Sequence, residues 1–283
     1  MSQPDTLDLQ AKERRLFEIV ADLGSALVAY SGGVDSTLLL RVCVDALGPL
    51  QVLAVTATSE TLATREELEA KSLAGGMGAR HLELPVSELQ DEAFVSNPPN
   101  RCYHCKRIRY GQLARLAHER GLRWVVDGAN ADDLGDYRPG LRAASELGVR
   151  SPLQEAGLSK ADVRRLSHAF GLPTWDKPSF ACLASRIPYG NRITAEKLRQ
   201  IDAAEGFLQS LGFQQVRVRH HGDTARIEVP SDDIVTLASR EVAPLVVERL
   251  KALGFSYVSL DLEGYRTGSM NELLHSTLAD KSF

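Results

Sequence analysis

The sequence contains little cysteine and no long hydrophobic run. No apolar stretch approaches the roughly 20 residues that a helix needs to cross a bilayer. Residues 1–20 mix acidic with basic side chains and contain no apolar signal core. The 283 residues include only 4 cysteines, too few for a fold held together by disulfides. We therefore expect a cytoplasmic protein without membrane contact, whose reduced thiols are available as ligands or nucleophiles.

Basic residues do not outnumber acidic residues in this sequence. The 33 lysine and arginine residues against 37 aspartate and glutamate residues give a formal net charge of −4. A protein that grips a nucleic-acid backbone usually carries a basic excess, so stable binding of DNA or RNA is disfavoured. The composition, 43% hydrophobic and 25% charged, suits a globular protein of one large domain or two moderate ones.

Short apolar segments alternate with amphipathic ones over the first 126 residues. Expected strands cover residues 26–30, 52–55, 81–84 and 124–126, and expected helices begin near residue 35 and cover residues 62–73 and 108–120. This alternation predicts an α/β fold, a doubly wound parallel sheet covered by helices on both faces. Residues 127–151 are polar and contain glycine and proline, and we interpret them as an active-site loop.

A second, smaller α+β domain is expected after a proline-rich stretch. We divide the chain into residues 1–180 and residues 181–283, because the prolines between residues 173 and 193 prevent regular structure. The second part reads as a helix at 194–211 capped by Thr194, a hairpin at 216–229, a helix at 242–253 and a strand at 257–262. We expect this domain to bind substrate and to contribute to a homo-oligomer.

A glycine-rich hexapeptide, SGGVDS at residues 31–36, lies between an expected strand and an expected helix. Its two glycines allow backbone N–H groups to approach an anion, and the helix directs its positive end to the same place. Phosphate fits such a site, although the Walker pattern of phosphate-transferring nucleotide enzymes is absent. The alternative is an ordinary glycine turn in which Asp35 caps the helix.

The hexapeptide resembles the PP-loop, SGGxDS, of the ATP pyrophosphatase superfamily. That superfamily includes the synthetases of NAD, GMP and asparagine and the tRNA-thiolating enzymes, and it cleaves ATP between the α and β phosphates. The resemblance implies that pyrophosphate is held by Ser31, Gly32, Gly33, Asp35 and Ser36. It also places Asp35 to bind Mg²⁺.

Two cysteines three positions apart, Cys102 and Cys105, form the second motif. Such a pair can bind a metal ion or cluster or form a redox disulfide. Cys182 strengthens the signal because it lies in an irregular loop after the nucleotide domain. Three thiolates suit an iron–sulfur cluster with one iron left open. Zinc would need a fourth ligand from His104 or His168.

The cysteines could also have no functional role. They could be unconnected small hydrophobic residues, which fits Cys43 best because it lies on the apolar face of an expected helix. We therefore exclude Cys43 from the site.

Longer phrases narrow the resemblance to one family over nearly the whole chain. NPPNRCYHCK, DGANADDLGDYRPG, RSPL, KPSFACLASRIPYG and DLEGYRTGSMNE follow in this order. Together they resemble the ATP-dependent sulfur transferases that help make the nickel-pincer nucleotide cofactor of lactate racemase. The resemblance implies adenylation of the carboxylates of pyridinium-3,5-biscarboxylic acid mononucleotide and replacement of oxygen by sulfur, twice.

That family has two versions. In one, a single cysteine gives up its own sulfur and is spent; in the other, three cysteines hold a [4Fe-4S] cluster. The resemblance implies that Cys102, Cys105 and Cys182 hold such a cluster and that it carries an extra sulfide. Sacrificial transfer from Cys182 is the alternative.

Basic residues of the second domain are candidates for binding the substrate. The alternation of the hairpin places Arg217 and Arg219 on one face. The resemblance implies that this pair and Arg266 bind the nucleotide phosphate of the substrate, whereas a solvated sheet face is the alternative. Ser185 and Arg186 are placed to hold the substrate's carboxylates or the adenylate.

The expected cofactors are ATP, Mg²⁺ and the [4Fe-4S] cluster, and the expected partners are a small nucleotide substrate and a sulfide donor. Glu205 and Glu228 match polar positions of the family, with no firmer role than helix or hairpin surface. The rival interpretations are a tRNA thiolase, an amide-forming synthetase of the same superfamily, and a non-catalytic nucleotide sensor whose cysteines hold zinc.

Overall fold

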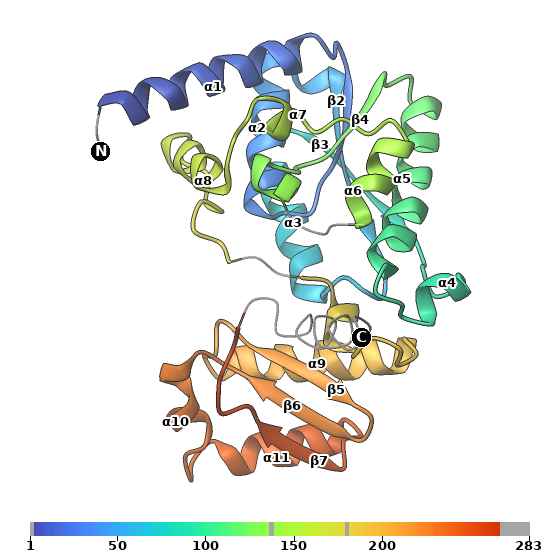
Figure 1. The fold of residues 1–283 in the computed structure, drawn as a ribbon, viewed down its shortest axis with the longest axis vertical. Coiled ribbons are helices and arrows are strands. Elements are labelled where there is room, and N and C mark those ends of the chain that lie inside the picture. The colour runs from blue at the N-terminus through green and yellow to red at the C-terminus, as the bar shows by residue number, and fades with distance from the viewer. Residues whose placement is uncertain (1–2, 136–138, 179–180, 267–283) are drawn as a thin grey trace, which may run out of the picture. The chain divides into compact units, whose positions relative to one another are not determined.

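A computed structural model describes residues 3–135, 139–178 and 181–266 (Figure 1). Its internal contacts divide the chain into two units. The first comprises Met1–Ser59, Thr64–Glu88 and Asn100–Phe180, and the second comprises Glu60–Ala63, Leu89–Pro99 and Ala181–Phe283. Two short segments from the first 180 residues thus belong to the second unit. The expected boundary after residue 180 adjoins residues 179–180, which lie outside the described residues.

The first unit is built on a parallel sheet. Its strands are β1 (Ala26–Ala29), β2 (Val52–Thr58), β3 (Arg80–Pro85) and β4 (Trp124–Val126), in the order β3-β2-β1-β4. Side chains of β1 alternate between two apolar clusters, with Val28 in one and Leu27 in the other. Both faces of the sheet are therefore buried, as in other parallel sheets.

Helices cover both faces of this sheet (Figure 1). One apolar cluster joins the sheet to α1 (Gln3–Ala21), α2 (Val34–Leu47), α3 (Thr64–Gly76), α7 (Pro152–Glu155) and α8 (Lys160–Ala169). The other cluster joins it to α5 (Arg101–Glu119) and α6 (Pro139–Glu146). This arrangement confirms the predicted doubly wound α/β fold. The chain moves outward through β2 and β3 on one side of β1 and returns to β4 on the other, so β1 and β4 flank the switch point where such folds bind ligands.

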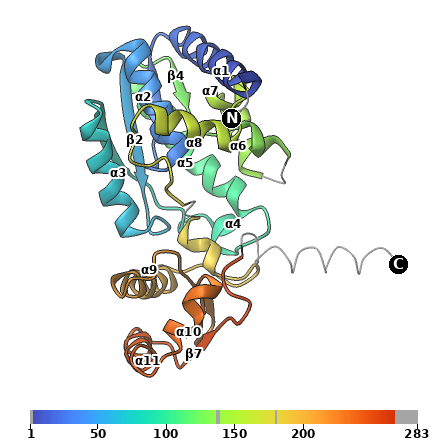
Figure 2. The same ribbon diagram turned by 90° about the vertical axis from the view of Figure 1, so that its left-hand side faces the viewer.

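The second unit contains a three-stranded sheet. Strand β5 (Arg217–His221) pairs antiparallel with β6 (Thr224–Glu228), which pairs in parallel with β7 (Tyr257–Leu260). Figure 2 shows α9 (Ala195–Ser210) and α11 (Ala243–Ala252) on one side of this sheet, where Val218 and Ile227 join their apolar core. The short helices are α4 (Glu92–Val95), α10 (Ile234–Leu237) and the 3₁₀ turns η1 (Pro49–Gln51), η2 (Ala131–Gly135), η3 (Leu183–Arg186) and η4 (Ser231–Asp233). The smaller α+β unit was predicted.

Local chemistry accounts for the ends of several helices. The Thr194 side chain accepts a hydrogen bond from the Lys197 N–H and caps α9, as predicted. Ser159 and Asp162 form a capping box at the start of α8. No helix of the described residues combines the length and the apolar character that a bilayer crossing requires.

The helix expected at residues 108–120 begins seven residues earlier, at Arg101. The prediction required apolar periodicity, which residues 101–107 lack, but these residues contain no helix breaker. Pro98 and Pro99 precede the cap at Asn100 and mark where the helix begins. The motif of Cys102 and Cys105 is therefore helical.

The stretch at 127–151 is not loop throughout. It contains η2 and α6, and α6 begins with a proline, the residue best suited to the first helical position. Ala143 and Ala144 are buried, and Ala144 shares an apolar cluster with α5, so a small-residue stripe that carried little periodicity in the sequence stabilises a helix in the fold. Residues 136–138 of this stretch lie outside the described residues.

Candidate active site

The hexapeptide at residues 31–36 connects β1 to α2 as predicted. Gly32 has φ +71°, a backbone conformation that favours glycine. A Cβ at this position would also lie only 3.0 Å from the Cα and Cβ of Ala70, so both the backbone and the space favour glycine here. Gly33 is the N-cap of α2, and no side chain caps this helix. The positive end of α2 is therefore directed at the loop, which suits an anion.

The serines fix the shape of the loop. The Ser36 hydroxyl lies 3.2 Å from the Gly33 carbonyl oxygen, to which it donates, and 3.1 Å from the Ser31 hydroxyl. The Ser31 hydroxyl in turn accepts a hydrogen bond from the Gly33 N–H at 3.4 Å. These hydrogen bonds all lie within the hexapeptide.

The loop after β4 packs directly against the loop after β1. A Cβ on Gly128 would lie 2.9 Å from the backbone nitrogen of Ser36 and 3.1 Å from the carbonyl carbon of Asp35. The Asp127 carboxylate, buried just before Gly128, accepts hydrogen bonds from the hydroxyls of Tyr110 at 2.5 Å and Ser151 at 2.7 Å. These contacts fix the second wall of the candidate nucleotide site.

Asp35 does not cap α2, so this part of the ordinary-turn alternative is wrong, and phosphate binding by the loop stays a prediction. Its Oδ1 accepts a hydrogen bond from the Asn130 side chain at 3.0 Å, and its Oδ2 forms an ion pair with the Lys160 ammonium group. On the other side of the loop, Lys177 donates to the Gly32 carbonyl oxygen at 3.4 Å and to the carboxylates of Glu66 and Glu69 at 2.9 Å. The loop is therefore bounded by two lysines, neither of which the sequence pattern singled out.

Cys102 and Cys105 occupy the first two turns of α5. At this spacing two helical side chains are neighbours on one face, with Cβ atoms about 5–6 Å apart. Cys102 is exposed, and the Cys105 thiol donates to Glu88 at 3.3 Å. Glu88 is fully buried and also pairs with Arg109, which donates to the Ser59 hydroxyl at 2.8 Å. The Cys105 thiol therefore lies beside an ion pair whose carboxylate is buried.

Cys182 is the N-cap of η3 in the second unit and is exposed. Cys43 is fully buried, and burial raises the pKa of its thiol to about 12, which agrees with its exclusion from the site. Within the described residues, no group of three or more His, Cys, Asp or Glu side chains has the geometry to hold a metal ion. The three-cysteine cluster thus stays a prediction.

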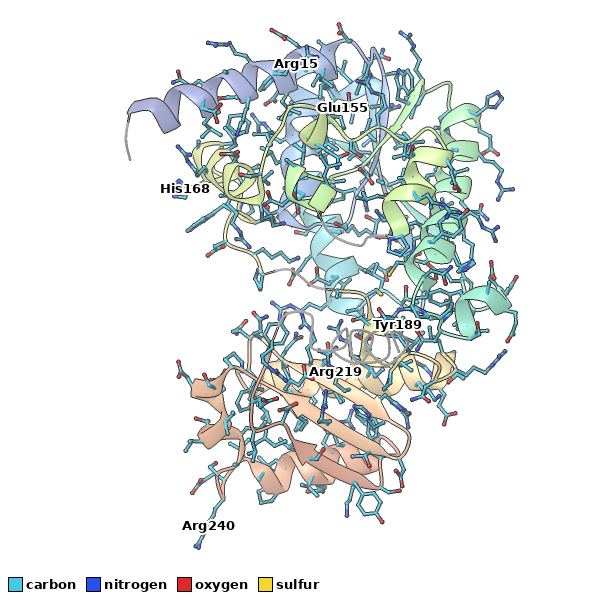
Figure 3. All side chains as sticks on the ribbon, viewed as in Figure 1. Arg15, Glu155, His168, Tyr189, Arg219 and Arg240 are labelled. Atoms are coloured by element: carbon cyan, nitrogen blue, oxygen red, sulfur yellow. The ribbon has the colours of Figure 1, made fainter. Side chains whose placement is uncertain are left out.

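Arg217 and Arg219 share the sheet face opposite α9 and α11, and both are buried (Arg219 is labelled in Figure 3). The alternative of a solvated face is therefore wrong. Arg219 makes two hydrogen bonds, of 2.9 and 2.7 Å, to the two carboxylate oxygens of Glu228, which is fully buried. Burial lowers the pKa of Arg217, and the charge of Arg186 lowers it further. Arg217 therefore lies buried beside other arginines whose charges are paired with glutamates.

Arg186 and Ser185 lie beside the same arginines. Arg186 makes two 2.9 Å hydrogen bonds to Glu205, and it donates to the Ser185 hydroxyl, also at 2.9 Å. The Ser185 carbonyl oxygen accepts from Arg219 at 3.1 Å. The sequence predicted that Glu205 and Glu228 lie on the surface of a helix and of the hairpin. This prediction is wrong, because both carboxylates are buried and paired with arginines. Arg266 differs from these arginines because its partner is an exposed carboxylate, that of Glu263 at 2.6 Å.

Sequence reasoning missed the residues that reach the PP-loop from elsewhere. Asn130 and Gly128 stand in the stretch predicted as an active-site loop, so their region was expected but their roles were not. Lys160 could have been identified from the sequence, because a lysine at the first position of a helix opposes the helix dipole and therefore indicates a role other than stabilising the helix. Lys177 offered none, since its partners lie more than 100 positions away in the sequence.

The chain is similar to several known proteins. A family model described as NAD synthase matches residues 13–107. An uncharacterised protein of Synechocystis is 44% identical over 266 residues, which are 94% of this chain and 99% of that protein. The pyridinium-3,5-bisthiocarboxylic acid mononucleotide synthase of Lactiplantibacillus plantarum is 42% identical over 269 residues, 94% of this chain and 96% of the synthase. A tRNA-specific 2-thiouridylase of Rickettsia rickettsii is 25% identical over 229 residues, 68% of this chain and 62% of that protein.

Proposed function

The chain belongs to the PP-loop family of ATP-dependent sulfur transferases that includes the pyridinium-3,5-bisthiocarboxylic acid mononucleotide synthase, and we propose that it acts on the corresponding dicarboxylate mononucleotide. The observation that carries this proposal is the 42% identity over 94% of the chain, which spans both units. The product would carry two thiocarboxylates in place of two carboxylates. The cytoplasmic location and homo-oligomeric state expected from the sequence stay predictions.

The PP-loop supports the activation step. A carboxylate oxygen is a poor leaving group, so the substrate oxygen first attacks the α-phosphorus of ATP and pyrophosphate leaves. The positive end of α2 and the N–H groups of the Ser31–Ser36 loop are suited to stabilise the departing pyrophosphate. Asp35 and the Ser36 hydroxyl offer the hard oxygen atoms that Mg²⁺ prefers, so the residues present fit this metal.

The basic face of the second unit supports the binding of a phosphorylated substrate. We propose that Arg217, with Arg219 and Arg266, binds the nucleotide phosphate, and that Ser185 and Arg186 orient the carboxylate that reacts. Arg186 and Arg219 are each fixed by a buried glutamate, which makes their guanidinium groups rigid and lowers the entropy lost on binding.

Substitution of Arg217 tests whether this site binds the substrate. Arg217→Ala should weaken binding of the dicarboxylate mononucleotide by about 1.5–3 kcal/mol, the usual size of a lost charge-assisted hydrogen bond, with little change in ATP binding. Arg192→Ala is the matched control, because Arg192 lies in the same unit and forms an exposed pair with Glu92. Equal substrate affinity in Arg217→Ala and wild type would reject the assignment.

For the sulfur source, we propose that Cys102 and Cys105, with Cys182 as third ligand, hold a [4Fe-4S] cluster. The thiol chemistry and the helical spacing of the first two cysteines fit such a cluster. When bound, a cluster with one iron free of cysteine would supply sulfide that is nucleophilic at neutral pH. The protein then needs no catalytic base for the attack on the acyl adenylate.

Anaerobic purification followed by iron analysis and turnover counting tests this assignment. Alanine at any of the three cysteines should abolish iron binding and sulfur transfer while adenylation survives, whereas Cys43→Ala should change neither. Many turnovers per protein are expected. A loss of about 34 Da at Cys182 after a single turnover, without any need for iron, would instead establish sacrificial transfer.

A further inference from the structure

Asn97 is fully buried in the second unit and has an unusual backbone conformation. Its φ of +56° makes it the one non-glycine residue with positive φ in the described part of the chain. This conformation is unfavourable for most residues, and asparagine tolerates it better than other non-glycine residues do. Residues held in rare backbone conformations cluster at functional sites, so the contacts of Asn97 indicate what it does.

Asn97 holds the loop that follows η3 through both its side chain and its backbone. Its side-chain nitrogen donates to the carbonyl oxygens of Ile187 at 3.2 Å, Pro188 at 2.8 Å and Asn191 at 3.0 Å. The Asn97 carbonyl oxygen accepts a further hydrogen bond from the Gly190 N–H at 2.9 Å. One buried amide therefore fixes the path of this loop.

The same contacts fix the turn on which Cys182 lies. Cys182 is the N-cap of η3 and Ile187 is its C-cap, so Asn97 holds the carboxyl end of the turn. At the amino end, the Leu183 N–H donates to the Thr61 carbonyl oxygen at 2.9 Å. Residues that precede α5 in the sequence therefore hold the turn at both ends.

Asn97 and Thr61 lie on the two short segments that leave the first unit. Glu60–Ala63 and Leu89–Pro99 belong to the second unit, although the chain on either side of each segment belongs to the first. Each segment forms hydrogen bonds with η3 or with the loop that follows it. Both segments thus support the position of Cys182.

We propose that Asn97 is a positioning residue for sulfur transfer, because it holds the turn that carries Cys182. It touches neither the substrate nor ATP and acts only through this cysteine. A displacement of about 1 Å at a reacting group can slow a reaction about 100-fold, so a small shift of the turn is costly. The inference rests on the proposed role of Cys182, and it holds whether this cysteine binds a cluster or gives up its own sulfur.

Asn97→Asp tests the proposal. Aspartate keeps the size of the side chain and tolerates positive φ, but it replaces the N–H donors by an oxygen that faces three carbonyl oxygens. Hydrogen exchange at the Gly190 N–H should be about tenfold faster or more, the effect of a lost buried hydrogen bond.

Two further measurements distinguish positioning of Cys182 from a merely structural role. In Asn97→Asp, release of iron from the anaerobically reconstituted protein to a chelator should be about tenfold faster, because the turn opens more often. Sulfur transfer in a single turnover should be about tenfold slower or more. Binding of a non-hydrolysable ATP analogue with Mg²⁺ should stay at the wild-type value, since the PP-loop lies in the first unit.

Asn97→Gly is the second variant and keeps the test open if Asn97→Asp fails to fold. Glycine adopts positive φ freely and removes the donor without adding a charge, so the same changes are expected. Asn191→Asp is the matched control, because it makes the same chemical change on an exposed side chain of the same loop and leaves the backbone carbonyl group in place. It should behave as the wild type.

Faster exchange at Gly190 with unchanged iron release and unchanged sulfur transfer would overturn the proposal, as would unchanged exchange. If the wild type forms the thiocarboxylate product and both Asn97 variants form it at the wild-type rate, only the role of Asn97 is refuted. If the wild type forms no product, the proposed function fails and the inference fails with it. If sulfur transfer needs no iron, the loss of about 34 Da at Cys182 replaces iron release as the measurement and should be about tenfold slower in both variants.

Discussion

Gly128→Ala is the substitution that most directly tests how the two loops at the sheet edge depend on each other. The new Cβ would lie 2.9 Å from the Ser36 nitrogen and 3.1 Å from two atoms of Asp35, where ordinary contacts begin at 3.4 Å. Both neighbours belong to the PP-loop and to the start of α2, and they are mostly backbone. The loops must therefore separate by about half an ångström.

The expected cost follows from that displacement. Inserting a methyl group into a packed site costs about 1–3 kcal/mol, so the free energy of unfolding should fall by this amount. A 1 Å misplacement of a reacting group can cost about 100-fold in rate, so half of it should slow pyrophosphate release about tenfold. The measurements are urea denaturation and a pyrophosphate assay with saturating ATP.

Gly111→Ala is the matched control. Gly111 lies inside α5, and a Cβ there would meet no described atom within 4 Å apart from the neighbouring backbone of its own helix. Alanine in a helix interior is more stable than glycine, so this variant should gain about 0.5–1 kcal/mol and keep its activity. If Gly128→Ala were as stable and as active as the wild type, the two loops would not constrain each other as described.

Three further predictions concern the buried charges, thiols and imidazoles. Arg219→Ala should lower the free energy of unfolding by about 2–3 kcal/mol in urea denaturation, because the buried Glu228 loses two charge-assisted hydrogen bonds while it keeps its pair with Arg226 at 2.9 Å; a loss under about 1 kcal/mol would contradict this. Alkylation of the native, metal-free protein should leave Cys43 unmodified in a mass spectrum and reach only the other three cysteines, since burial raises the Cys43 pKa to about 12. Burial also lowers the pKa of His220, so the unfolded chain binds its proton more readily; this contribution to stability is complete above about pH 6.5 and is lost as the pH falls through the folded-state value. His220→Gln should therefore flatten the fall in stability between about pH 7.5 and pH 5.5, and an unchanged slope would refute the role of His220.

The sequence was a good guide to the elements whose signal is local. The parallel sheet, the PP-loop between β1 and α2, and the cap at Thr194 follow from short-range pattern and were predicted correctly. The start of α5 and the existence of α6 were missed, because small and polar residues carry little periodicity.

Contacts between distant segments explain most of what could not be predicted. Residues 89–99 belong to the second unit because Asn97, at the unusual φ of +56°, donates its side-chain N–H groups to carbonyl oxygens of Ile187, Pro188 and Asn191. No local sequence pattern predicts that Asn97 contacts carbonyl groups about 90 positions away. The same holds for the burial of Glu205 and Glu228, which depends on arginines brought to them by tertiary packing.

The site was predictable to a similar degree. The residues proposed to bind phosphate come from one contiguous motif, and their loop lies between a strand and a helix as expected. Asn130 and Lys160, which contact the carboxylate of Asp35, lie 95 and 125 positions further along the chain. Asn130 reaches it because β4 pairs with β1, and Lys160 reaches it because α8 packs against α2. The tertiary fold thus supplied partners that the motif alone could not predict.

The fate of ATP and of the substrate's oxygen decides whether the chain adenylates its substrate before sulfur transfer. The protein is incubated with Mg²⁺, ATP, sulfide and the dicarboxylate mononucleotide carrying heavy oxygen in its carboxylates. Adenylation followed by sulfur transfer predicts pyrophosphate and an AMP that contains one heavy oxygen from the substrate, with neither product formed by Asp35→Ala. Formation of ADP and orthophosphate, or of AMP without the label, would show that the substrate's carboxylate is not adenylated.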